Sequence, residues 1–115
     1  MNIKNKLNSI LFEDNNTYEI NDGSDRYPYK PEVHRDMNFV SGVTYGKLIS
    51  AFSRMGNNIE VTFCTFFPKD KRVQVVFSNS VDVEVIRTLL RNHGITIPSI
   101  SVNNDVGTEI WMQFG

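Results

Sequence analysis

The stretch IEVTFCTFFPKDKRVQVVF, residues 59–77, decides the fold of this chain. Apolar side chains alternate with other residues on both sides of Pro68-Lys69-Asp70-Lys71, which predicts two antiparallel strands joined by a tight turn. On the first strand the expected core-facing residues are Ile59, Val61, Phe63 and Phe67, and those on the opposite face are Glu60, Thr62, Cys64 and Phe66. On the return strand the expected core-facing residues are Val73, Val75 and Phe77, and the residues on the opposite face are Arg72, Gln74 and Val76.

A helix is predicted on each side of this hairpin. Thr44 can cap the first, and Ser80 can cap the second, which Gly94 closes at its C-terminus. The apolar stripe of the first helix is Tyr45, Leu48, Ile49, Phe52 and Met55, and that of the second is Val81, Val85, Ile86, Leu89 and Leu90. Each helix can therefore cover one face of a sheet.

A second hairpin is predicted at the C-terminal end, formed by residues 100–102 and 108–114. Its last strand should turn Ile110, Met112 and Phe114 toward the core and leave Glu109, Trp111 and Gln113 outside. The region before the core divides into residues 1–20, with an amphipathic helix and a short strand, and residues 21–36, a long polar loop. Residues 37–115 form the core of a single domain.

Together these elements predict an α+β fold with a mainly antiparallel sheet of about four to five strands. Two amphipathic helices should cover one face of the sheet, with an N-terminal helix in addition. A split βαββαβ (ferredoxin-like) arrangement is the natural topology for this order.

Composition narrows the class of protein. The chain has 115 residues, a net charge of −1 and one cysteine. This favours one ordinary globular domain without disulfides, and it offers no global attraction to nucleic acid or anionic lipid. No apolar run approaches the length of a membrane span, so we expect a cytoplasmic protein with no membrane partner. The 13 asparagines suit turns and are typical of AT-rich genomes, as in many phages.

Motifs for catalysis or metal binding are absent from the sequence. The remaining candidates are Cys64, His34 and His93, and their spacing matches neither a nucleophile–base pair nor a set of metal ligands. We therefore expect no enzymatic activity, no metal and no cofactor.

Two surfaces are candidates for partner binding. One is the outward sheet face, where exposed aromatic and arginine side chains suit an interface: Phe39, Arg72, Gln74 and Trp111. The other is the long loop, which mixes aromatic rings with positive charge: Arg26, Tyr27, Tyr29, Lys30, His34 and Arg35. Two alternatives stay open, since the N-terminal helix could cover Trp111 and the loop tyrosines could pack back onto the domain.

Three stretches within residues 38–102 carry a resemblance to a known family: NFVSGV, AFSRMGNNIEVTF and KRVQVVF. In order, they resemble the first-strand signature, the helix-to-second-strand passage and the third-strand signature of the RNA-recognition-motif family. The resemblance implies a four-stranded sheet that stacks bases on exposed aromatics, with Phe39 at one stacking position. Arg72 and Gln74 stand where the family has its two third-strand aromatics.

These observations give two functional hypotheses beside the disfavoured one of an enzyme, which would need Cys64, His34 or His93 to converge in one pocket. The first is a small non-enzymatic protein that occupies a macromolecular partner, with a protein partner favoured. Such a protein could be a phage or mobile-element accessory protein that inhibits a host or defence factor. The second is a nucleic-acid-binding module that uses the sheet face. A homodimer formed through an exposed strand edge is open under both.

Overall fold

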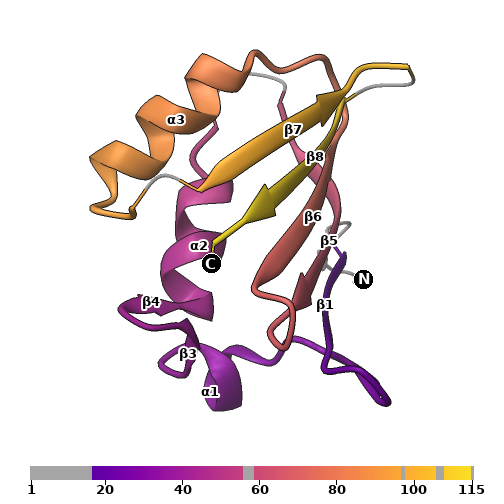
Figure 1. Ribbon diagram of the computed structural model, residues 1–115, viewed down its shortest axis with the longest axis vertical. Coiled ribbons are helices and arrows are strands. Elements are labelled where there is room, and N and C mark those ends of the chain that lie inside the picture. The colour runs from indigo at the N-terminus through magenta and orange to yellow at the C-terminus, as the bar shows by residue number, and fades with distance from the viewer. Residues whose placement is uncertain (1–16, 56–58, 97, 106–107, 115) are drawn as a thin grey trace, which may run out of the picture.

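The computed structural model describes residues 17–55, 59–96, 98–105 and 108–114. Its main sheet has six strands in the order β2-β1-β5-β6-β8-β7, and β3 and β4 form a separate two-stranded sheet. Both long helices lie on the same side of the main sheet (Figure 1). The strands are β1 (Thr17–Asn21), β2 (Arg26–Pro28), β3 (Asn38–Val40), β4 (Val43–Thr44), β5 (Val61–Phe67), β6 (Arg72–Phe77), β7 (Ser99–Asn103) and β8 (Thr108–Gln113). The helices are α1 (Pro31–His34), α2 (Tyr45–Phe52) and α3 (Val83–Asn92).

The α+β class is confirmed, with a sheet that is antiparallel except at one pair of neighbours. β1 runs parallel to β5, and the connection between them contains α2. β6 and β7 are joined through α3, and β8 lies between them in antiparallel pairing with both. The predicted four to five strands and the ferredoxin-like split are not confirmed. The sheet has six strands, and β1 and β5 are direct neighbours with no strand inserted between them.

The predicted long loop, residues 21–36, contains regular structure. β2 pairs antiparallel with β1, and α1 begins with Pro31 at its first turn, where the missing N–H costs nothing. Gly46 N donates to Arg35 O at 3.0 Å, and a Cβ at Gly46 would lie 2.8 Å from that oxygen. The glycine therefore lets the end of α1 sit against the first turn of α2.

The predicted alternation in β5 holds for Val61 and Thr62 and is wrong from Phe63 onward. The register with β6 shifts between Val61 and Phe63, which marks an irregularity of the bulge type. Past this point the faces are exchanged, so Cys64 and Phe66 are fully buried while Phe63 and Phe67 are partly exposed. Strands β6 and β8 keep the predicted alternation, with Val73, Val75, Phe77, Ile110 and Met112 buried.

The two long helices have the predicted positions. The Thr44 side chain caps α2 by accepting from Lys47 N at 3.1 Å, and Leu48 and Phe52 are buried beneath it. In α3 the N-cap is Asp82 rather than the predicted Ser80, and Ile86 and Leu90 are buried. Val85, predicted to lie in the buried stripe, is 43% exposed.

Thr108 ties the start of α3 to the C-terminal hairpin. Its hydroxyl, fully buried, accepts from Val81 N at 2.8 Å and donates to Asn104 Oδ1 at 2.9 Å. Thr108→Val keeps the shape but leaves the Val81 N–H without an acceptor. We expect the variant to lower the free energy of unfolding by about 1–3 kcal/mol, measured by urea denaturation. Thr88→Val, on the exposed surface of α3, is the matched control. A Thr108→Val loss no larger than that of the control would contradict this role.

The predicted N-terminal helix, residues 2–12, lies outside the described residues. The short strand predicted after it is confirmed as β1. Among the residues that the structure describes, no helix is long and apolar enough to cross a membrane.

Candidate binding face of the sheet

The sheet face opposite the helices is the outer face, and its side chains form rows that cross the strands. The central row runs Pro28–Glu19–Thr65–Gln74–Trp111–Ser101 through all six strands. Next to it, the register aligns Phe67, Arg72, Gln113 and Ser99. No helix of the described part of the chain lies on this face (Figure 1). Strand pairing therefore positions its side chains, of which Phe67, Gln74 and Trp111 are partly exposed.

Trp111, Phe67 and Arg72 form a compact cluster on the outer face. The rings of Phe67 and Trp111 are stacked, with centroids 5.8 Å apart and planes inclined by 26°. Arg72 Cζ lies 5.2 Å from the Trp111 centroid and 5.9 Å from that of Phe67, within the range of cation–π attraction. Both rings are partly exposed and Arg72 is exposed. We call these three residues the aromatic–arginine cluster.

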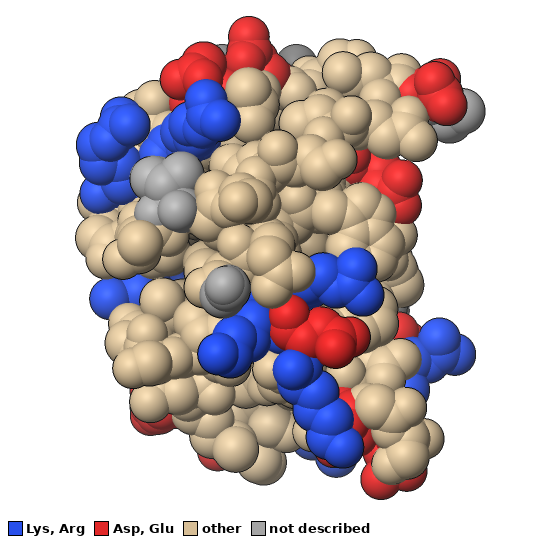
Figure 2. Space-filling view, viewed as in Figure 1, with Lys and Arg blue, Asp and Glu red and all other residues tan. Residues whose placement is uncertain are grey.

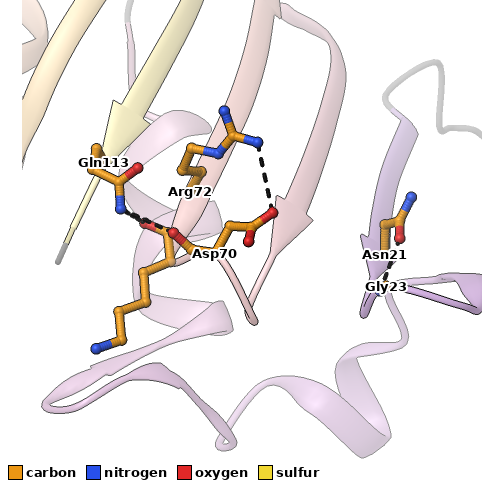
Figure 3. A network of polar contacts seen from close by, with 6 residues as sticks. Asn21, Gly23, Asp70, Arg72 and Gln113 are labelled. Carbon is orange, nitrogen blue, oxygen red and sulfur yellow. Dashed lines mark hydrogen bonds and ion pairs between the residues drawn. The ribbon is translucent and has the colours of Figure 1, made fainter.

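The turn between β5 and β6 holds the arginine in place. Arg72 pairs with the Asp70 carboxylate at 3.6 Å, while Gln113 Nε2 donates to Asp70 O at 2.9 Å (Figure 3). Phe114 N also donates to Lys71 O, at 2.8 Å, so the end of the C-terminal strand fastens the β6 side of the turn. The guanidinium is thus directed along the face by a turn that is itself fixed.

Polar side chains occupy the middle of the outer face. Gln74 Nε2 donates to Glu109 Oε2 at 2.5 Å. Within the described chain, Thr65 Oγ1 and Glu19 Oε1 are buried without a hydrogen-bond partner, and Arg26 Nε is 3.8 Å from that carboxylate oxygen. Glu19 and Thr65 face each other across β1 and β5. Both oxygens are enclosed by neighbouring side chains and the sheet, so they belong to the interior of this face.

Of the predicted sheet-face residues, Arg72, Gln74 and Trp111 lie together and Phe39 does not. Phe39 belongs to β3, in the separate two-stranded sheet, and is 5% exposed. Its ring packs on Phe66, Tyr45 and Phe114 at centroid distances of 5.5–5.7 Å. This residue belongs to the core, and the stacking position implied by the RNA-recognition-motif resemblance is not on the outer face.

The predicted loop residues divide into inward rings and outward charges. Tyr27, Tyr29 and His34 lie within 5.6–6.5 Å of one another or of Tyr45, and His34 Nδ1 accepts from Lys30 N at 2.9 Å. The remaining three predicted residues are exposed, and they are Arg26, Lys30 and Arg35. The tyrosines thus pack back onto the domain, so rings and charges do not form one shared surface.

This packing raises tyrosine pKa values. Burial, assisted by Tyr27 and Asp22, raises the pKa of Tyr45 from 10.0 to about 12, and burial also raises that of Tyr18. An unfolded chain ionises at the lower pKa, so stability is complete below pH 10 and falls as pH rises toward 12.

We expect the free energy of unfolding to fall by about 2–3 kcal/mol across that window, from the two-unit shift of Tyr45 alone. Denaturation measured from pH 9 to 12 checks this, and Tyr45→Phe should flatten the profile. An unchanged slope in Tyr45→Phe would show that this phenol does not titrate with unfolding.

Cys64 is fully buried in β5, and burial raises the pKa of its thiol well above the ordinary value. A thiolate is the reactive form of cysteine, so this environment disfavours nucleophilic chemistry. His93, the second predicted candidate, lies at the C-cap of α3 with Nδ1 3.0 Å from Leu89 O. Among the described residues, no group of histidine, cysteine and carboxylate side chains could hold a metal ion.

Sequence analysis missed Phe67 because strict alternation along β5 assigns it to the core. No signal in the sequence marks the irregularity that turns it outward. Comparison with protein-family models, with curated proteins and with solved structures found no match to this chain.

Proposed function

We propose that this protein is a non-enzymatic binding protein that engages a protein partner through the outer face of its sheet. The observation that supports this most is the aromatic–arginine cluster, exposed on a face that no described helix covers. Tryptophan and arginine are enriched among the residues that carry most of the binding energy of protein interfaces. Strand pairing and the fastened turn hold the cluster before a partner arrives, which lowers the cost of binding.

Charge favours a protein partner over nucleic acid. A single-strand binding groove needs positive charge along its length. On the outer face Arg72 is paired with Asp70, Glu19 lies in the central row, and Glu109 lies opposite Val76 in the row beyond it. The side of the molecule in Figure 2 likewise shows acidic and basic side chains interspersed. Phosphates would meet both signs of charge here.

We also propose a wider role for this protein, as an accessory protein of a phage or mobile element. It would inhibit a host or defence factor or act as an adaptor for it. Occupying a partner's surface requires no catalytic group. Its support is the asparagine-rich composition together with a preformed interface and no catalytic motif.

The test is a pull-down from a host lysate with and without nuclease, comparing wild type with Arg72→Ala. Arg91→Ala removes an exposed arginine from α3, on the other side of the sheet, and is the matched control. We expect a protein that survives nuclease and is lost only with Arg72→Ala. Recovery of nucleic acid alone, released by salt, would instead support the nucleic-acid module. Equal capture by Arg72→Ala and wild type would remove the outer face from the proposal.

A further inference from the structure

The two edges of the main sheet differ in how they are protected. The β2 edge is three residues long, carries exposed Arg26 and ends at Pro28, which has no N–H to donate. Charge, proline and short length are devices that keep an edge strand from pairing. The β7 edge, Ser-Ile-Ser-Val-Asn, is five residues long with no charge and no proline, and its register with β8 is regular.

The β7 edge is open to pairing within the described chain. In the sheet, β7 is hydrogen-bonded to β8 alone, which leaves the backbone groups of its other side directed outward. Ile100 and Val102 point to the core side. They are only partly buried, because β7 is the edge strand and no further strand of the sheet lies beside it. An added strand would satisfy the backbone and cover these two side chains.

We propose that β7 pairs antiparallel with β7 of a second copy of this chain, centred on Ser101. The segment is complementary to itself in this register. Ile100 meets Val102 of the second copy on the core side, while Ser101 meets its own copy on the outer face. Ser99 meets Asn103, so the register pairs all five residues and opposes no like charges. A second copy therefore suits the edge without requiring any other partner.

The pairing fixes how the two outer faces are arranged. A two-fold axis through an antiparallel pair runs perpendicular to the sheet, so both outer faces point the same way. Trp111 is the register partner of Ser101. The two tryptophans then lie in one cross-strand row, three strand spacings or about 14 Å apart. The dimer would present two aromatic–arginine clusters on one continuous face, whatever those clusters bind.

The test uses opposite charges at Ser101, whose side chain is exposed. We expect wild type to show twice the chain mass of 13.2 kDa by light scattering or sedimentation. Ser101→Lys and Ser101→Glu should each fall to the single-chain mass, because like charges then face each other across the axis. An equimolar mixture of the two variants should return to the doubled mass.

The matched control is Ser50→Lys, which adds the same charge at an exposed position of α2 and should remain dimeric. Far-UV circular dichroism checks that each variant is folded. A wild type that stays at the single-chain mass up to its solubility limit would overturn the proposal. So would a dimeric Ser101→Lys, and charged variants that fail to recombine would overturn the register centred on Ser101.

Discussion

Replacing Phe66 with alanine is expected to lower the free energy of unfolding by about 3–5 kcal/mol, the range for removing a buried phenylalanine. The Phe66 ring is fully buried and lies between Phe39 and Tyr45, at centroid distances of 5.5 and 5.0 Å. These neighbours come from different elements, so the cavity cannot close by the movement of one side chain. For a domain of this size, a loss that large consumes a substantial part of the total stability.

Phe67→Ala is the matched control, because it makes the same chemical change one residue further along β5. Its ring is partly exposed and its main contact is the Trp111 stack, so we expect a loss of about 1 kcal/mol. Urea denaturation of both variants compares the two values directly. A larger loss for Phe67→Ala than for Phe66→Ala would mean that the faces of β5 are not exchanged and that the strict alternation is correct.

This pair of residues shows where sequence periodicity stops being informative. Alternation predicted the faces of β6 and β8 correctly, since an unbroken two-residue period sends Val73, Val75 and Ile110 to one side. In β5 one additional residue near Thr62 exchanges the faces. Because Phe66 and Phe67 are both aromatic, composition cannot say which one is buried.

The pairing of β1 lay beyond what the sequence could predict. Its parallel contact with β5 joins residues more than forty positions apart, and no local pattern encodes such a contact. β2 was interpreted as loop, because Pro28 and the surrounding charges are loop signals that are also tolerated on an edge strand. The helices are easier to predict from the sequence, because the cap of α2 and the buried apolar stripes are local properties.

The candidate site was predictable in part for the same reason. Arg72, Gln74 and Trp111 share a face because β6 and β8 keep their period. Phe39 is assigned to that face through its match to a stacking position of the RNA-recognition-motif family, and the short stretch Asn38-Phe39-Val40 does not say which sheet it joins. Ring packing then brings it to the core. Tertiary contacts, which the sequence does not display, determine the positions of both Phe39 and Phe67.

Trp111→Ala is expected to weaken binding of the protein partner by roughly 30- to 700-fold, equal to about 2–4 kcal/mol. Trp111 occupies the central row of the outer face and contacts both other members of the aromatic–arginine cluster. Its removal would therefore delete the largest side chain of the proposed interface, and Phe67 and Arg72 would lose the ring that both contact. A peripheral contact would lose far less.

Titration calorimetry with the captured partner measures this loss, and Trp111→Phe separates ring area from position by restoring part of the affinity. Tyr29→Phe, on the side of the sheet that packs against α1 and α2, should bind as wild type does. Trp111 is the single tryptophan of the chain, so its emission reports on the face itself. A partner that binds Trp111→Ala within twofold of wild type, and leaves the emission of wild type unchanged, would have to engage another surface. The outer face would then hold a structural stack rather than an interface.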